Sequence, residues 1–180
     1  MRHPVTAARV EEFMKALGSL VRSPARVFLV GGATAVLLGW RDATIDIDLK
    51  AIPDRDDILR QLTALKERLN INIELASPDD FIPELPGWGD RSLFVRQEGK
   101  ITFLHYDFYA QALAKIERSH DHDLKDVQEM IRSGLVEPGR LLELFNQIEL
   151  DIQKYPALDA ASFRRAVELV IGRTSERENT

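Results

Sequence analysis

The feature that most constrains the fold is an apolar segment that ends in two glycines and is followed by a pair of alternating aspartates. Residues 27–30 are continuously apolar, which is typical of a strand covered on both faces, and they run directly into Gly31 and Gly32. Thirteen residues, enough for one short helix, separate Gly32 from Asp46, and Asp48 follows after a single isoleucine. Because side chains alternate along a strand, both carboxylates point to one face, about 7 Å apart at their Cα atoms. The sequence therefore predicts a strand–turn–helix–strand unit that presents two acids on one face.

The rest of the chain predicts a small α/β core followed by helices, an α+β arrangement of the chain as a whole. Hydrophobic periodicity, proline and glycine predict helices at 6–22, 33–38 and 54–69, strands at 27–30, 44–51 and 71–75, a hairpin of 93–97 with 101–106, and helices at 107–118, 120–133, 137–154 and 159–171. We expect residues 1–110 to form the core and residues 111–180 to form a helical region packed on it. The apolar stripe of the helix at 137–154 is expected to pack against the last helix, and the sequence leaves open whether the protein is a monomer or a dimer.

Composition excludes several classes of protein. The chain has no cysteine, which removes disulfides, thiolate zinc sites and cysteine nucleophiles and fits a reducing compartment. No apolar run approaches the roughly 20 residues of a membrane span, so we expect a cytoplasmic protein without a membrane partner. The net charge of −5 gives no broad basic surface for nucleic acid.

Asp46 and Asp48 are the strongest candidates for chemistry. Acids are depleted in strands, and two of them on one face repel each other unless something compensates their charge. A divalent cation with oxygen ligands resolves that repulsion. The alternative is an edge strand with a solvated polar face, balanced by Arg41 or Lys50.

The glycine pair has two interpretations as well. Its backbone N–H groups could face a phosphate, or Gly31 and Gly32 could simply make a tight turn that needs small residues. No lysine follows in the pattern of a phosphate-binding loop, and the third glycine of a dinucleotide fingerprint is missing. The two acids that follow the glycine pair at this distance favour the phosphate-binding interpretation of the turn.

Together, the glycine pair and the Asp-Ile-Asp-Leu strand resemble the signature of the nucleotidyltransferase superfamily that includes the DNA polymerase β palm. Residues 32–35, Arg41 and Thr44 are also similar to small bacterial nucleotidyltransferase-like proteins, among them abortive-infection toxins of the type IV toxin–antitoxin class. The resemblance covers about residues 1–130 and implies a mixed sheet flanked by helices, with a C-terminal helical extension. Many members have serine at the position of Gly32, so here the resemblance implies only backbone contacts with phosphate.

The resemblance also implies a third carboxylate and a cationic group. Glu74, an acid within the apolar strand 71–75, is the first candidate for the third carboxylate. Asp107 is the second, although we favour a helix-capping role for it. Lys115 and Arg118 share one side of a helix and could meet a triphosphate, with Asp123 and Asp126 orienting them; the alternative is a surface ion-pair network between consecutive helices.

The function implied by the resemblance is metal-dependent nucleotidyl transfer. Asp46, Asp48 and Glu74 would bind Mg²⁺ or Mn²⁺, the glycine pair would hold the phosphates of a nucleoside triphosphate, and Lys115 with Arg118 would counter the leaving pyrophosphate. The acceptor could be an RNA end, a protein or a small molecule, and a partner antitoxin is expected if the chain is a toxin. The alternatives are a degenerate nucleotide-binding relative and an interaction protein that uses its C-terminal helices.

Overall fold

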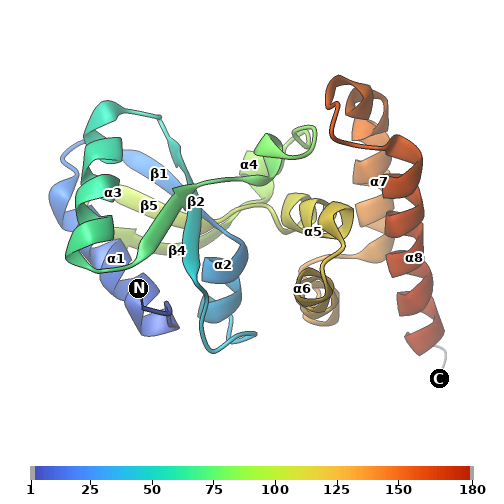
Figure 1. Ribbon diagram of the computed structural model, residues 1–180, viewed down its shortest axis with the longest axis horizontal. Helices are drawn as coiled ribbons and strands as arrows, with labels where there is room; N and C mark the ends of the chain where they lie inside the picture. The colour runs from blue at the N-terminus through green and yellow to red at the C-terminus, as the bar shows by residue number, and fades with distance from the viewer. Residues whose placement is uncertain (1–2, 179–180) are drawn as a thin grey trace. The chain divides into compact units, whose positions relative to one another are not determined.

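The computed structural model describes residues 3–178 and the side chains of residues 3–174 (Figure 1). The elements along the chain are α1 (Ala7–Leu20), β1 (Ala25–Val30), α2 (Gly31–Leu37), β2 (Asp46–Ile52), α3 (Asp56–Arg68), β3 (Asn72–Leu75), η1 (Pro78–Asp80), α4 (Trp88–Arg91), β4 (Leu93–Glu98), β5 (Ile101–His105), α5 (Phe108–Arg118), α6 (Asp121–Arg132), α7 (Pro138–Ile148), η2 (Glu149–Lys154) and α8 (Ala160–Glu178). The order and type of these elements confirm the predicted α+β class.

The chain divides into two compact units. The sheet unit consists of Met1–Ser77 and Ser92–Tyr106, and the helical unit consists of Pro78–Arg91 and Asp107–Thr180. The break at Tyr106 lies close to the division expected after residue 110, but the segment between β3 and β4 groups with the later helices. Each unit is described below by itself.

The sheet of the first unit is mixed, with strand order β3-β2-β1-β5-β4. Strand β1 pairs antiparallel with β2 and parallel with β5, while β2 pairs parallel with β3. Strand β2, which carries the two aspartates, therefore lies inside the sheet with a partner on each side. The interpretation of that segment as an edge strand is wrong.

The two faces of β2 differ as the alternating sequence requires. Ile47, Leu49 and Ala51 are buried, whereas Asp46 and Asp48 are half-buried on the opposite face. The apolar face forms one core with the stripes of α1 and α3, which contribute Val10, Phe13, Met14, Leu17, Ile58, Leu62 and Leu65. Each fully buried side chain of this kind contributes about 1.5–3 kcal/mol, so this core fixes which face of β2 carries the acids.

Two glycines allow α1 to pack closely on the β4–β5 hairpin. Gly99 turns the hairpin with a φ of 56°, and a Cβ atom on it would overlap the carbonyl oxygen of Gly18. A Cβ atom on Gly18 would in turn lie 2.6 Å from the carbonyl oxygen of Glu98. Helix and hairpin therefore meet backbone to backbone.

The helical unit packs its C-terminal helices against one another, as the apolar stripe predicts. Phe145 on α7 meets Phe163 on α8 edge-on, with ring centroids 4.9 Å apart, and both side chains are buried. Helix α7 ends earlier than expected, because the chain tightens into η2 at Glu149, and α8 continues to Glu178 instead of ending near residue 171. Among the residues described, no helix combines the length and the apolar character needed to cross a membrane.

Candidate active site

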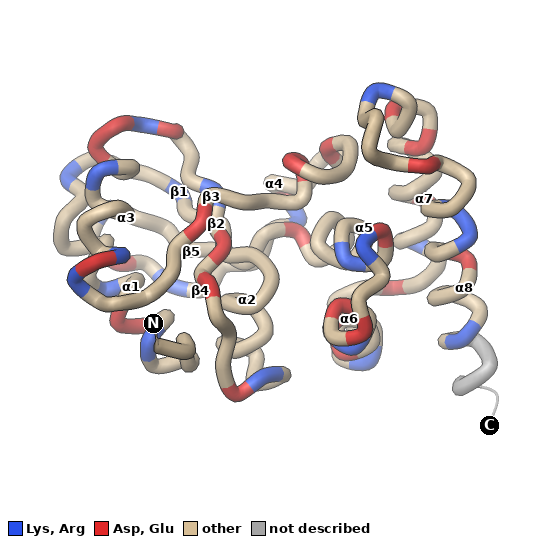
Figure 2. Tube along the Cα trace, viewed as in Figure 1, with Lys and Arg blue, Asp and Glu red and all other residues tan. Residues whose placement is uncertain are grey.

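The three predicted acids lie on neighbouring strands of the sheet unit. Strands β2 and β3 run parallel, with Asp48 opposite Glu74 and Asp46 opposite Asn72. Residues opposite each other in a ladder point to the same face, so all three carboxylates share the face of the sheet away from the apolar core. Figure 2 shows the acidic positions of β2 and β3 beside one another.

Asn72 links two of these acids. Its side-chain amide nitrogen donates to Asp46 Oδ1 at 2.5 Å and to Glu74 Oε1 at 2.7 Å. The two carboxylates thus approach a single amide group from adjacent strands. Asn72 is not among the predicted site residues, although its place two residues before Glu74, and so on the same face, was the available signal.

The glycine turn lies beside the acids. Val30, the last residue of β1, is the ladder partner of Asp48, and the chain turns at Gly31 with a φ of 58°. A Cβ atom on Gly31 would lie 3.4 Å from Asp48 Oδ2. The backbone of the turn therefore runs next to the Asp48 carboxylate.

A buried polar pair holds the segment after the turn. Thr34 on α2 donates its hydroxyl to the carbonyl of Leu29 at 3.2 Å, and its oxygen lies 3.0 Å from Nδ1 of His105 on β5. Burial lowers the pKa of the His105 imidazole to about 4, so this side chain is neutral at pH 7. The pair ties α2 to β1 and β5 and fixes the direction in which the chain leaves the glycine turn.

The chemistry of the acids suits a hard divalent cation. Carboxylate oxygens are the ligands that Mg²⁺ and Mn²⁺ prefer, and Asp46, Asp48 and Glu74 supply only oxygen. Among the described residues, no three histidine, aspartate or glutamate side chains are grouped closely enough to hold a metal ion as they stand. Glu74 is exposed, so its carboxylate has room to reorient toward the aspartates.

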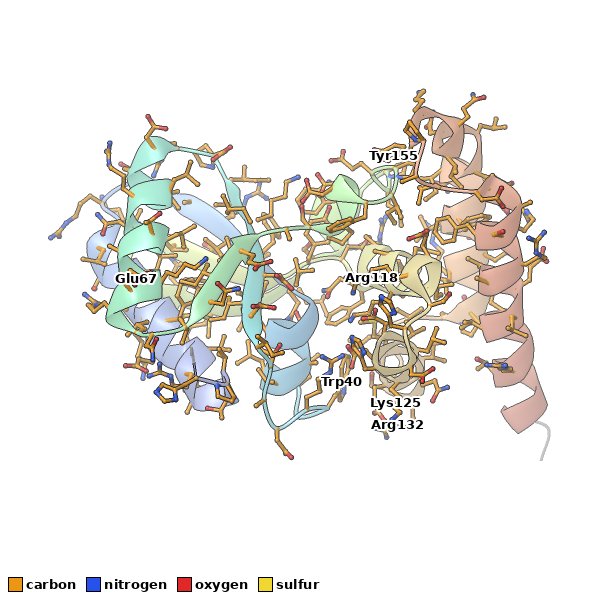
Figure 3. The ribbon with its side chains drawn as sticks, in the orientation of Figure 1. Trp40, Glu67, Arg118, Lys125, Arg132 and Tyr155 are labelled. Atoms are coloured by element: carbon orange, nitrogen blue, oxygen red, sulfur yellow. The ribbon has the colours of Figure 1, made fainter. Side chains whose placement is uncertain are left out.

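The predicted cationic group lies in the helical unit, where it is engaged with acids. Lys115 Nζ contacts Asp123 Oδ1 at 3.0 Å and Asp126 Oδ2 at 2.8 Å, and only 5% of Lys115 is exposed. Arg118, which projects from α5 in Figure 3, reaches the same Asp123 oxygen at 2.9 Å. The ion pairs between consecutive helices are present, but Lys115 and both acids are buried, and only Arg118, with 45% of its side chain exposed, reaches the surface.

Burial and charge act in opposite directions on Asp123. Desolvation alone would raise the pKa of this carboxyl, but the Lys115 ammonium, helped by Arg118, outweighs it and holds the pKa below the ordinary value of 3.8. The second oxygen of Asp123 is buried and has no hydrogen-bond partner within the described part of the chain. Lys115 and Arg118 thus serve first to compensate buried acids, and their contact with a nucleotide stays a prediction.

Asp107 has the capping role that the sequence favours. Its carboxylate accepts from the backbone N–H of Tyr109 at 3.2 Å at the start of α5, and Arg91 Nη2 donates to it at 2.7 Å. The residue is fully buried. These two interactions give the Asp107 carboxylate a structural role at the start of α5.

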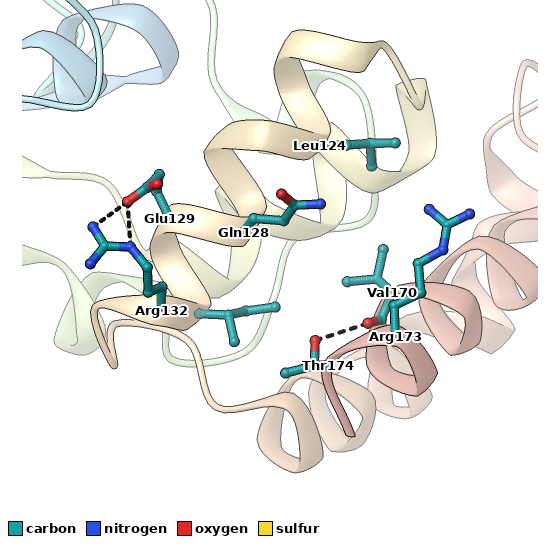
Figure 4. A pocket seen from close by; sticks show the side chains of 8 residues that line it. Leu124, Gln128, Glu129, Arg132, Val170, Arg173 and Thr174 are labelled. Atoms are coloured by element: carbon teal, nitrogen blue, oxygen red, sulfur yellow. Dashed lines mark hydrogen bonds and ion pairs between the residues drawn. The ribbon is translucent and has the colours of Figure 1, made fainter. Parts of the chain in front are cut away.

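The helical unit also has a groove between α6 and α8 with a volume of about 460 Å³ (Figure 4). Apolar, polar and charged side chains line it: Leu124, Gln128, Glu129, Ile131, Arg132, Val170, Arg173 and Thr174. Glu129 and Arg132 pair with each other on the α6 side. No predicted site residue lines this groove.

Comparison with known families gives the strongest independent finding. Residues 7–172 match the family described as "Nucleotidyltransferase of unknown function (DUF6036)". The chain belongs to this family. The match spans both units and supports the nucleotidyltransferase superfamily that the glycine turn and the aspartate pair indicate. Comparison with curated proteins gave no match, and comparison with solved structures gave none either.

Proposed function

We propose that the protein is a metal-dependent nucleotidyltransferase, which moves a nucleoside monophosphate from a nucleoside triphosphate to a hydroxyl acceptor. The observation that carries this proposal is the common face of Asp46, Asp48 and Glu74 beside the Gly31 turn, in a chain that belongs to a nucleotidyltransferase family. A cluster of acids alone would not identify this reaction. The combination of the acids, the adjacent turn and the family supports it.

The acids would hold the metal, and the turn would hold the substrate. Asp46 and Asp48 would supply the first oxygen ligands for Mg²⁺ or Mn²⁺, and Glu74 on the neighbouring strand would complete the set. A bound divalent cation neutralises phosphate charge and helps to orient the triphosphate for in-line displacement. The backbone N–H groups of Gly31 and Gly32 would bind phosphate oxygens next to the carboxylates.

The proposed reaction is a single displacement at phosphorus. The oxygen of the acceptor hydroxyl forms a bond to the α-phosphorus, and the bond from that phosphorus to the oxygen bridging to the β-phosphate breaks. Pyrophosphate leaves with that oxygen, and the hydroxyl proton passes to Glu74 or to water. Arg118, with 45% of its side chain exposed, is a more accessible cation for pyrophosphate than Lys115.

The acceptor and the cellular role are proposed only by class. An RNA end, a protein hydroxyl and a small molecule all provide the required nucleophile. The resemblance to abortive-infection proteins supports a toxin role with a partner antitoxin. Induced expression should then arrest growth, and Asp46→Asn with Asp48→Asn should relieve the arrest at equal protein level.

A second candidate function is nucleotide binding without turnover, and the burial of Lys115 favours it. Its ammonium is buried between Asp123 and Asp126, so the side chain as it stands is not presented to pyrophosphate. Titration that shows triphosphate affinity, with no product found by mass spectrometry across RNA, protein and small-molecule acceptors, would favour this assignment over catalysis.

The decisive experiment compares two double variants in a pyrophosphate-release assay. Asp46→Asn with Asp48→Asn removes the charge of both metal ligands and should lower Mg²⁺-dependent release by at least about 100-fold, the scale of losing electrostatic stabilisation in a transition state. Asp54→Asn with Asp56→Asn makes the same chemical change at two exposed positions beyond the other end of β2 and should leave turnover unchanged. Unchanged turnover in the first variant would reject the proposal.

A further inference from the structure

The glycine turn is covered by a hydroxyl group from a different part of the chain. A Cβ atom on Gly32 would overlap Oγ1 of Thr44 and would lie 2.6 Å from Cβ and 3.2 Å from Cγ2 of the same side chain. These are the three nearest atoms, so Thr44 occupies the space that any side chain at position 32 would need. Gly32 is therefore required to be glycine by Thr44 and not only by the turn.

Thr44 cannot move aside easily. Its backbone bridges to Val5, with N–O distances of 2.7 Å and 2.9 Å for the two hydrogen bonds. Because threonine is branched at Cβ and short, its hydroxyl stays close to the backbone that carries it. The backbone that carries the Thr44 hydroxyl is thus held beside the glycine turn.

The position of this hydroxyl relates it to the acids. Thr44 precedes Asp46 by two residues, and the turn that it touches continues to Gly31, beside Asp48. Thr44 is half-buried, so part of its side chain stays accessible at the turn. A polar group at the turn is therefore available to a ligand there.

We infer that Thr44 binds a phosphate of the nucleoside triphosphate, in the place where a serine following the first glycine of the turn would otherwise supply the hydroxyl. The inference rests on the proposed function. Its new content is an exchange: the hydroxyl comes from Thr44, two residues before β2, and glycine at position 32 makes room for it. The pair of positions 32 and 44 can therefore hold one hydroxyl-bearing side chain, from either side.

The exchange is tested by binding, without turnover. The probes are inorganic tripolyphosphate and the α,β-methylene analogues of ATP, CTP, GTP and UTP, titrated calorimetrically in Mg²⁺. Thr44→Val keeps the shape and removes the hydroxyl, so affinity should fall about ten-fold or more, the value of a hydrogen bond to a charged group. Thr44→Ser keeps the hydroxyl and should remain within about three-fold of the wild type on the same scale. Thr102→Val, the same change on β5 near the other end of the sheet, should have no effect.

Exchanging the residues at positions 32 and 44 separates the effect of the hydroxyl contact from the effect of side-chain shape. Gly32→Ser alone places a side chain against Thr44 and should weaken binding. Thr44→Gly alone removes the hydroxyl and should weaken binding too, whereas Gly32→Ser combined with Thr44→Gly should bind more tightly than either single variant.

Each contrary result has a distinct meaning. Wild-type affinity in Thr44→Val, or an equal loss in Thr44→Ser, would overturn the role of Thr44 while the proposed function stands. Failure of the swapped pair to exceed Thr44→Gly would overturn the exchange. Absence of triphosphate binding by the wild-type protein would overturn both this inference and the proposed function.

Discussion

The two units use carboxylates in opposite ways. In the sheet unit, Asp46 and Asp48 are half-buried and Glu74 is exposed, and two of the three contact a neutral amide. In the helical unit, Asp123 and Asp126 are 1% and 3% exposed and are bound by the Lys115 ammonium. The residue type is the same in both places, but solvent and partners differ.

The difference follows from the cost of burying charge. A carboxylate removed from water must be compensated by a cation and hydrogen bonds, and its partner is then committed to it. A carboxylate that water still reaches keeps its charge at little cost and can exchange water for a metal or a ligand. Exposure therefore separates acids suited to binding from acids that support the fold.

The largest expected effect is on the stability of the helical unit when its buried cation is removed. Lys115→Met leaves Asp123 and Asp126 as two buried carboxylates without their shared ammonium, which should lower the free energy of unfolding by about 3–5 kcal/mol. The chain has two tryptophans, one in each unit, so the fluorescence of Trp88 in a Trp40→Phe background reports on this unit during urea unfolding. Adding Asp123→Asn and Asp126→Asn should recover much of the loss.

Arg118 provides the matched comparison within the same network. It pairs with Asp123, but 45% of its side chain is exposed, so Arg118→Ala should cost no more than about 1 kcal/mol. Equal losses for Lys115→Met and Arg118→Ala would contradict the view that burial decides the strength of these ion pairs.

Much of the fold could be predicted because its signals are local. The alternation of Asp46, Ile47, Asp48 and Leu49 determines which face of β2 enters the core, and each predicted strand and helix overlaps an observed one, although α7 and α8 end elsewhere. The capping role of Asp107 was also visible, since it directly precedes the helical pattern of α5.

The features that could not be predicted depend on contacts between residues far apart in sequence. No local pattern shows that Gly18 and Gly99 meet backbone to backbone, or that Thr44 fills the space beside Gly32. Spacing placed Lys115 near acids but could not reveal its burial, because burial depends on what other helices cover. The contacts of the candidate site were therefore less predictable than the strands that carry it.

The next largest expected effect is a loss of stability at low pH, caused by the buried His105 of the sheet unit. The folded-state pKa of His105 is about 4, below the ordinary value of 6.5, because burial disfavours the charged imidazole. Its contribution to stability is complete above pH 6.5 and is lost as pH falls toward 4, since only the unfolded chain takes up the proton there. The loss should reach at most about 3 kcal/mol.

Trp40 fluorescence in a Trp88→Phe background measures this loss in urea between pH 7 and pH 4. His105→Gln should be less stable at pH 7 but should lack most of the pH dependence. In the same window the ion pair of Asp123 with Lys115 should change little, because the pKa of Asp123 lies below 3.8. A pH dependence in the sheet unit that persists in His105→Gln would assign it to another group.

The smallest effect on stability is expected where the largest effect on activity is proposed. Asp46 and Asp48 are half-exposed, so replacing both by asparagine should change the unfolding free energy, read by Trp40, by no more than about 1 kcal/mol in either direction. A loss above about 2 kcal/mol would mean that these acids support the fold as Asp123 and Asp126 do, and the contrast between the units would fail.

Mg²⁺ provides a second test of the same two aspartates, because a cation that binds only the native state raises its stability with concentration. Millimolar Mg²⁺ should therefore stabilise the wild-type sheet unit and not the double variant, and an equal shift in both would place the bound cation somewhere other than on these two aspartates.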